Sequence, residues 1–361
     1  MTTAAAQPHA PGPGRRRAAR GTDVARLAGV SQKTVSRVLN NEPHVKDEIR
    51  RTVLQAAREL GYRPNGAARA LLSGRTNRIG VVALGSTLHG PASLLMGIER
   101  QARALGYGLS IVNTDEGDPD GVPRAVDALL EQGVDGVVVS EPSDLGPVYV
   151  TIDVPVLVLG SRRGLTAPTV VEPAGISEQA AYDATRHLLD LGHRTVHHVM
   201  GPARWLDAQE RLNGWRRALA EASAPVTEPV EGDWSPASGF AAGSRLAADP
   251  QLRAVFVAND DMAIGLIRAL TAAGLHVPDD VSVIGVDDVP LAPYVNPPLT
   301  TMAQPFEEIA RAGLSALVQA IEDPDGQATH EVRIPARLVL RGSTAAPRAP
   351  SPPARPQPVA P

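Results

Sequence analysis

Residues 22–40 read TDVARLAGVSQKTVSRVLN, a pattern typical of two short helices joined by a tight turn. Thr22 stands where an N-cap side chain accepts a free backbone N–H, and Gly29 is expected to end the first helix. The spacing i, i+3, i+4 predicts one apolar face on this helix, formed by Val24, Leu27 and Ala28. The stretch therefore has the proportions of a helix-turn-helix.

The second helix of this stretch carries different side chains on its two faces. Ser31 is expected to cap it, with Val30 in the turn before it, and an inward face is predicted for Val35, Val38 and Leu39. The opposite face presents Gln32, Lys33, Ser36 and Arg37. Gln can hydrogen-bond adenine, and Lys and Arg can hydrogen-bond guanine, so this face suits a DNA major groove.

A third helix predicted at residues 46–60, with Gly61 as its stop, completes a three-helix unit. The alternative is a helical hairpin with a merely solvated polar face. The charge distribution favours DNA binding: residues 15–78 contain fifteen Lys or Arg against five Asp or Glu, which leaves 20 basic against 34 acidic residues elsewhere. A basic N-terminal part attracts phosphates, whereas an acidic remainder is repelled by them.

Length and composition limit the other possibilities. A chain of 361 residues suggests two or three domains, and its 43% apolar content suffices for burial. The chain has no cysteine, so it can form no disulfide, thiol nucleophile or Cys-zinc site, and we expect no cofactor or metal. Since neither a signal peptide nor a run of eighteen apolar residues is seen, we expect a cytoplasmic protein without a membrane partner.

From residue 78 onward short apolar runs alternate with helical patterns. RIGVVAL, YGLSIVN, VDGVVVS and VPVLVLG are predicted as buried parallel strands, and RTVHHVM, RAVFVAN and VSVIGV repeat the theme. Helices are predicted near 91–106, 121–132, 175–191, 204–222, 235–248, 260–273 and 306–322, and a final strand within VRIPARLVL. Two doubly wound sheets imply two lobes, with a ligand site beyond the carboxyl ends of the strands.

The expected organisation follows from these patterns. A disordered basic segment spans 1–20, the helix-turn-helix domain 21–63, a hinge helix and linker 64–77, the core 78–343 and a disordered Pro-rich tail 344–361. Within the core, the N-lobe takes about 78–172 and 304–330, and the C-lobe about 173–303 and 331–343. The hinge, which could also be a plain linker, is too short to be stable alone, and Leu71 could wedge into a minor groove.

The motifs together resemble the lactose-repressor (LacI/GalR) family over about residues 22–342. The resemblance rests on TDVARLAGVSQKTVSRVLN, RPN at 63–65, VAND at 257–260, VSVIGVDD at 281–288 and PPLTTMAQP at 297–305. Within the family, LHGP at 88–91, RLNGW at 211–215 and GDWSPASGF at 232–240 are most similar to the lactose repressors. The family has a helix-turn-helix head and a two-lobed periplasmic-binding-protein-like core.

The resemblance implies a homodimer that binds pseudo-palindromic operator DNA and a small sugar effector. DNA contacts are implied for Gln32, Lys33, Thr34, Ser36, Arg37, Asn40, His44, Asn65 and Leu71. Effector contacts are implied for Leu88, Pro91, Arg211, Trp234, Asn259, Asp287 and Phe306. Hydroxyls of a sugar suit Asp, Asn and Arg, and its C–H faces suit an indole.

Each effector residue also has an ordinary structural interpretation. Asn259 and Asp260 could cap a helix, with Asp260 the better candidate, and Asp287 with Asp288 could form a turn. Arg211 could make a surface ion pair and Trp234 could belong to the core.

The sequence also departs from the family pattern. Arg20 and Gly21 replace the usual start of the first helix, Gly66 lies inside the hinge helix, and Gly160 replaces an acidic sugar ligand. Tetramerisation through a C-terminal helix is not supported.

The sequence therefore predicts a transcriptional repressor of a sugar-utilisation operon, released by a sugar that is expected to be a galactoside. The alternative within the family is a regulator that responds to another sugar or a nucleoside, even as co-repressor. A transporter's sugar-binding protein would need an export signal and no basic head. An enzyme would need a catalytic motif, whereas His197 and His198 lie in a predicted strand, where core or surface roles are expected.

Overall fold

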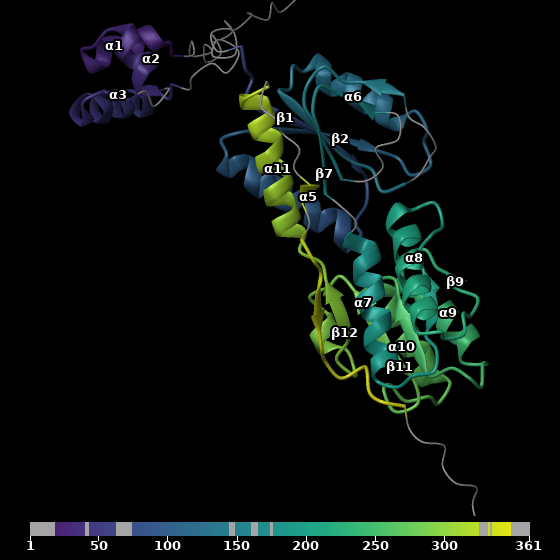
Figure 1. Ribbon diagram of the computed structural model, residues 1–361. Helices are drawn as coiled ribbons and strands as arrows, with labels where there is room; N and C mark the ends of the chain where they lie inside the picture. The colour runs from purple at the N-terminus through teal and green to yellow at the C-terminus, as the bar shows by residue number, and fades with distance from the viewer. Residues whose placement is uncertain are drawn as a thin grey trace, which may run out of the picture. The chain divides into compact units, whose positions relative to one another are not determined.

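The computed structural model describes residues 19–39, 43–62, 74–143, 149–159, 165–173, 176–324, 331–332 and 334–347. The chain forms two compact units, Met1–Thr76 and Asn77–Pro361 (Figure 1). The predicted hinge contacts Asn65 and Leu71, together with Asn40, Gly66 and Gly160, lie outside the described residues. Within the described segments, no helix combines the length and apolarity needed to cross a membrane.

The N-terminal unit is a three-helix arrangement of α1 (Gly21–Ala28), α2 (Gln32–Leu39) and α3 (Asp47–Glu59). Its core contains Val24, Val35, Val38 and Val53, each exposed by 3% or less. Gly29 and Gly61 follow α1 and α3 with φ of 66° and 60°, which confirms them as helix stops because a side chain rarely adopts this backbone conformation.

Two details of the first helix differ from the sequence prediction. The helix begins two residues earlier, so the N-cap is Arg20 and not Thr22, and the Asp23 carboxylate accepts the Arg20 backbone N–H at 2.9 Å. Leu27 is 51% exposed, whereas Ala25 is buried. The prediction for Leu27 is wrong because the buried arc of α1 passes through Val24 and Ala25, away from Leu27.

The second unit contains two lobes, each built on a six-stranded sheet. In the first lobe the strand order is β13-β7-β5-β3-β1-β2, and all pairings are parallel. Its elements are β1 (Arg78–Leu84), α5 (His89–Ala104), β2 (Gly108–Thr114), α6 (Gly121–Glu131), β3 (Gly136–Ser140), β4 (Val150–Thr151), β5 (Val156–Val158), β6 (Leu165–Thr166), β7 (Val170–Pro173), α11 (Phe306–Glu322) and β13 (Glu331–Val332).

Alternate residues of β1 enter two different cores, as expected for a strand covered on both faces. Ile79, Val81 and Ala83 pack with α5 and α11, and Val82 packs with α6. The strand predicted at 107–113 forms as β2 and pairs in parallel with β1. Because β2 lies at the sheet edge, Ile111 is 46% exposed, and the prediction that this strand is buried is wrong.

In the second lobe the strand order is β14-β12-β11-β10-β8-β9, with β14 antiparallel to β12. Its elements are α7 (Ile176–Asp190), β8 (His197–Met200), α8 (Leu206–Glu221), β9 (Val230–Glu231), α9 (Pro236–Leu246), β10 (Ala254–Val257), α10 (Asp260–Ala272), β11 (Ser282–Val286), the 3-10 helix η1 (Ala292–Tyr294), β12 (Thr300–Ala303) and β14 (Arg337–Val339). Helices α7 and α8 share one apolar core, and α9 and α10 share another. His198 is fully buried and stacks on Phe256 at 4.8 Å. His197 is also buried, so both histidines take the expected core role.

Two predicted boundaries are wrong at their edges. Strand β13 pairs with β7, so residues 331–332 belong to the first sheet and not to the second lobe. Thr344 and Ala345, expected in the disordered tail, are hydrogen-bonded to the second lobe, since Thr344 pairs with His187 and the Ala345 N–H donates to Ser282.

Candidate functional site

Helix α2 presents a polar surface built on a buried apolar one. The Ser31 hydroxyl oxygen accepts the Thr34 backbone N–H at 3.1 Å, which confirms the cap at the start of the helix. Gln32, Lys33 and Ser36 are exposed and Arg37 is partly exposed, while Val35 and Val38 are buried. The face that the sequence assigns to the DNA groove is thus available at the surface.

Two further predicted DNA contacts, Thr34 and His44, lie in different local settings. The Thr34 hydroxyl lies 2.9 Å from that of Ser31, so it takes part in the start of α2. His44 is exposed in the turn before α3, with a φ of 67°.

A cavity of about 200 Å³ lies between the two lobes, beyond the carboxyl ends of β3, β10 and β11. The structure brings all seven predicted effector residues together around it: Leu88, Pro91, Arg211, Trp234, Asn259, Asp287 and Phe306. Seven further polar or aromatic lining residues were not predicted: His89, Ser140, Ser177, Trp205, Asp207, Glu210 and Gln304. Gln304 belongs to the PPLTTMAQP motif, and Asp207 and Glu210 share a helix with Arg211, so both signals were present in the sequence.

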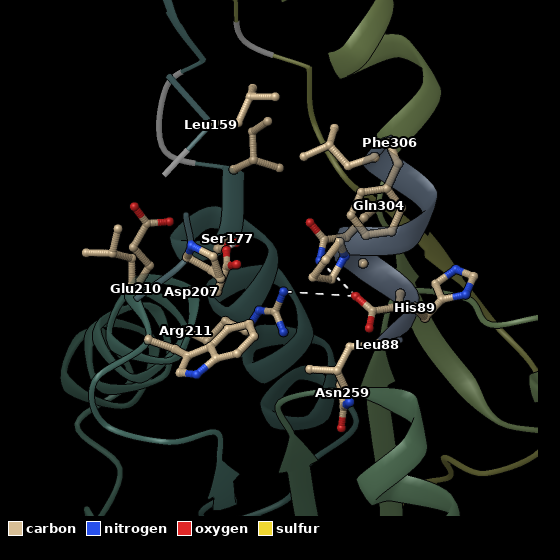
Figure 2. Close-up of a pocket in the computed structure, with 18 of the residues that line it drawn as sticks. Leu88, His89, Leu159, Ser177, Asp207, Glu210, Arg211, Asn259, Gln304 and Phe306 are labelled. Carbon is tan, nitrogen blue, oxygen red and sulfur yellow. Dashed lines mark hydrogen bonds and ion pairs between the residues drawn. The ribbon is translucent and has the colours of Figure 1, made fainter. Parts of the chain in front are cut away.

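Asp287 follows β11 and holds a carboxylate at the cavity in a fixed orientation. Its φ is 115°, its backbone N–H donates to the Met302 carbonyl at 2.9 Å, and the Gln304 side-chain N–H donates to its Oδ1 at 2.9 Å (Figure 2). Burial raises the pKa of Asp287 to about 6, although the nearby Arg211 acts in the opposite direction. The left-handed turn is therefore more than a surface turn, because it places an acceptor where a ligand hydroxyl can reach it.

Arg211 and Trp234 line the cavity beside this carboxylate. Both are only 4% exposed. Arg211 donates one Nη1 hydrogen bond to the Ala258 carbonyl, its Nη2 lies 4.0 Å from Asp287 Oδ1, and its guanidinium lies 5.5 Å from the Trp234 ring centre. Arg211 Nε and Trp234 Nε1 have no hydrogen-bond partner within the described chain. Both atoms are closed off from the cavity, and the Cε2–Cζ2 edge of Trp234 packs against Gly201. The polar group that these observations leave for a ligand hydroxyl is the Asp287 carboxylate.

Asn259 lines the cavity but is also the N-cap of α10. Its Oδ1 accepts the Met262 N–H at 3.0 Å and its Nδ2 donates to the Trp234 carbonyl at 3.1 Å. The interpretation of Asp260 as the cap is wrong. The Asp260 carboxylate instead accepts the Thr301 hydroxyl at 2.6 Å and the Val289 N–H at 2.9 Å, because it is buried below the turn that carries Asp287.

The opposite wall of the cavity is mostly apolar. Pro91 lies on α5, Leu88 directly precedes this helix, and Phe306 is the first residue of α11. The His89 ring contacts the Phe306 ring edge-on, with 6.0 Å between the ring centroids. Trp205 lies edge-on to Trp234 at 5.4 Å. A ring with an apolar face and polar edges, such as a sugar or a nucleobase, fits between aromatic walls and polar groups of this kind.

Three hydrogen bonds connect the lobes beside Trp205, and we call this group the Glu116 bridge. Arg204 Nη2 and Nε donate to Glu116 Oε1 at 2.7 and 3.0 Å, and Trp205 Nε1 donates to the same oxygen at 2.8 Å. The Trp205 hydrogen bond is the largest cause of the lowered pKa of Glu116. Glu116 follows β2, whereas Arg204 and Trp205 precede α8, so the bridge ties a wall of the cavity to the other lobe.

Comparison with known proteins identifies the family. The model of bacterial regulatory proteins, lacI family, matches residues 22–65, and a periplasmic binding protein-like domain matches residues 185–344. The Ribose operon repressor of Escherichia coli (strain K12) is 35% identical over 335 residues, which cover 89% of this chain and 98% of the relative. The chain belongs to the lacI family.

Other lacI-family proteins give the same result. The HTH-type transcriptional repressor PurR of Photobacterium profundum is 34% identical over 320 residues, covering 86% of this chain and 93% of the relative. The solved Lac repressor dimer bound to operator and the anti-inducer ONPF is 31% identical with a TM-score of 0.76, and the match covers 91% of this chain and 100% of that one. These matches confirm the predicted family and its fold, a helix-turn-helix head with a two-lobed core.

Proposed function

We propose that this protein is a transcriptional repressor that binds operator DNA through α2 and is controlled by a small sugar or nucleoside in the cavity between the lobes. The observation that carries the proposal is the cavity itself, where the Asp287 carboxylate is held in place by Gln304 beside Arg211 in a lacI-family core. Family membership supports the DNA-binding half, because the lacI-family match spans the three helices that expose Lys33 and Arg37.

Two classes of effector are candidates for the cavity, a sugar and a nucleoside. The sequence pointed to a galactoside through likeness to the lactose repressors, but the relatives include a ribose operon repressor and PurR. The lining of the cavity suits any ring with several oxygens. A nucleoside is the second candidate, since Trp205 and Trp234 provide aromatic surface for a base.

Control requires that the effector binds one arrangement of the lobes better than the other. A ligand shifts the population by no more than this preference, which is commonly about 1 to 3 kcal/mol of coupling. Since the cavity is lined from both lobes, a bound effector acts directly on their relative pose. We propose that the change reaches α2 through the connecting segment and lowers operator affinity.

Homodimer formation is part of the proposal, because a pseudo-palindromic operator needs two copies of α2. Exposed apolar side chains on the second unit could form the contact: Met96, Ile111, Leu291 and Tyr294, which are 53%, 46%, 53% and 82% exposed. Sedimentation of the full chain with operator DNA measures the stoichiometry, and one chain per operator would contradict this part.

Lys33→Ala tests the DNA-binding half. We expect a loss of about 10- to 100-fold in affinity for a selected operator, measured by fluorescence anisotropy, together with relaxed preference at one base pair, since a base contact is worth about 1–3 kcal/mol. Arg58→Ala, which removes an exposed positive charge from α3, is the matched control and should leave the base preference unchanged. If Lys33→Ala kept the same base preference as Arg58→Ala, Lys33 on α2 would not be a residue that reads the DNA sequence.

Glu116→Gln tests the role of lobe closure. The variant keeps its shape but loses the charge that three N–H groups share, so we expect about tenfold weaker effector binding by calorimetry. Glu231→Gln is the control, because Glu231 accepts the Ala203 N–H of the same loop without leaving its own lobe. An equal loss in both variants would mean that loop order, and not the bridge between the lobes, sets the affinity.

A further inference from the structure

The backbone of Trp234 is held in a strained conformation at the wall of the cavity. Its φ is 73°, in the left-handed region that a bulky residue rarely adopts. The residues on both sides are fixed, because the Gly232 N–H donates to the Met200 carbonyl at 2.8 Å and Ser235 is the N-cap of α9. Asn259 Nδ2 also donates to the Trp234 carbonyl at 3.1 Å. Strain of this kind persists only where the surroundings impose it, so the fold sets the direction of the Trp234 side chain.

The indole reaches its place because residue 201 has no side chain. Gly201 is buried directly after β8, and a Cβ built on it would lie 2.2 Å from both Cη2 and Cζ2 of Trp234. Carbon atoms pack at about 3.5 to 4.0 Å, so any side chain at this position would move the ring by more than about 1 Å. The φ of Gly201 lies outside the left-handed range, so its φ does not require a glycine. The glycine is required for space.

A ring displaced from Gly201 has few directions in which to move. The Trp205 ring lies edge-on to the Trp234 ring at 5.4 Å, and the Arg211 guanidinium lies 5.5 Å from the Trp234 ring centre. Trp234 lines the cavity and also a neighbouring hollow of about 140 Å³. These two spaces are open to a displaced indole, and a movement into either of them changes the wall that an effector meets.

We propose that Gly201 is a positioning residue of the effector site and that it acts through Trp234. Because residue 201 has no side chain, the indole packs against the end of β8 and leaves room in the cavity for a ring-shaped effector to stack on it. The inference rests on the proposed function and adds a residue that does not itself line the cavity.

The experiment is a double-substitution cycle on the full chain, measured by titration calorimetry. The unmodified protein is first titrated with ribose, galactose, adenosine and guanosine, and the compound that binds most tightly is the probe. We expect Gly201→Ala to bind this probe about 100-fold more weakly, since a displacement of about 1 Å at a binding wall has an effect of this size. Trp234→Phe keeps an aromatic face but lacks the indole's Cζ2 and Cη2, and it should bind about tenfold more weakly.

The variant that carries both Gly201→Ala and Trp234→Phe distinguishes ring position from a general structural role. Its added methyl group no longer meets the outer indole atoms, so we expect it to bind the probe within about threefold of Trp234→Phe and more tightly than Gly201→Ala. Gly108→Ala is the control, because Gly108 is exposed on β2 and its added Cβ would meet only the Asn77 carbonyl oxygen, at 3.9 Å. This control should bind the probe like the unmodified protein.

The outcomes separate the inference from the proposed function. A Gly201→Ala protein that binds the probe as tightly as the unmodified protein would overturn the inference. An equal loss from Gly201→Ala with Trp234 or with Phe at position 234 would also contradict it, because the methyl group would then act on β8 and not on the indole. If Gly201→Ala alone does not fold, the doubly substituted protein should fold and bind like Trp234→Phe, and its failure to fold would refute the inference. If the unmodified protein binds none of the four compounds, the proposed function is contradicted together with the inference that rests on it.

Discussion

Asp287→Ala is expected to leave operator binding intact and to abolish release of the operator by the effector. Asp287 supplies the fixed acceptor at the cavity, because its turn, Met302 and Gln304 all restrain it. Removing it deletes hydrogen bonds to the ligand and leaves Arg211 without the carboxylate at 4.0 Å. We expect about 100-fold weaker effector binding, equivalent to about 2.7 kcal/mol, measured by calorimetry and by operator release in an anisotropy titration.

The neighbouring carboxylate provides the control for this prediction. Asp288 lies in the same turn but pairs with Arg341 at 2.6 Å and does not line the cavity. Asp288→Asn should lower stability while effector affinity stays within about threefold. If Asp287→Ala still releases the operator at the usual effector concentration, the cavity is not the effector site.

A second variant, Asp287→Asn, separates loss of binding from loss of folding. The φ of 115° is less strained for Asn than for Ala, since Asn tolerates positive φ better. The pKa of Asp287 in the folded protein is raised from the ordinary 3.8 to about 6, so the folded state binds more protons than the unfolded state between these values. Stability contributed by this group is therefore present at low pH and is lost as the pH rises from about 4 to 6.

The Asp287→Asn protein has no carboxyl group at this position, so its stability does not fall for this reason between about pH 4 and pH 6. It should be more stable than the unmodified protein above pH 6, by on the order of 2 kcal/mol, with the difference disappearing near pH 4 in urea denaturation. A variant that is both stable and unresponsive to effector would show that Asp287 serves binding at a cost to stability. Equal pH dependence in the two proteins would contradict the assignment of the pKa to this carboxylate.

Local sequence patterns predicted the long elements well. The apolar runs of β1, β3, β10 and β11 lie close to their predicted positions, because a parallel strand buried on both faces needs such a run. The Ser31 cap and the stops at Gly29 and Gly61 also follow from local backbone chemistry. The short strands β4, β6 and β9 have two residues each and no pattern of their own, since tertiary pairing alone defines them.

Sequence motifs predicted part of the candidate site, whereas contacts between residues distant in the sequence define the rest. Its seven predicted members came from motif positions, and they do line one cavity. In the Glu116 bridge, Arg204 and Trp205 are separated from Glu116 by 88 and 89 positions in the sequence. No local pattern indicates a contact over such a separation. Asn259 and Asp260 are adjacent polar residues at a helix start, and only the packing of Asp260 under Thr301 and Val289 decides which of them caps the helix.

Gly265→Ala is expected to unfold the second lobe, although alanine is the better helix former. Helices α9 and α10 approach each other through two glycines: a Cβ on Gly265 would lie 1.9 Å from the Pro236 carbonyl oxygen, and one on Gly239 would lie 2.0 Å from that of Met262. Both obstacles are backbone atoms, which cannot rotate away. The gain in helix propensity of about 1 kcal/mol is therefore outweighed by a packing cost of about 3 kcal/mol or more.

The same substitution at Gly90 is the matched control. Gly90 also lies in a helix, but its added Cβ would meet the Phe306 ring at 3.4 Å, and a side chain can shift by a few tenths of an ångström. Gly90→Ala should change the free energy of unfolding by less than about 1 kcal/mol, whereas Gly265→Ala should lower it severalfold more in the same urea titration. Because Asn259 at the start of α10 donates to the Trp234 carbonyl, Gly265→Ala should also weaken effector binding in whatever fraction stays folded. A Gly265→Ala protein as stable as the unmodified one would show that α9 and α10 can separate without loss, and that their contact does not hold the cavity wall in place.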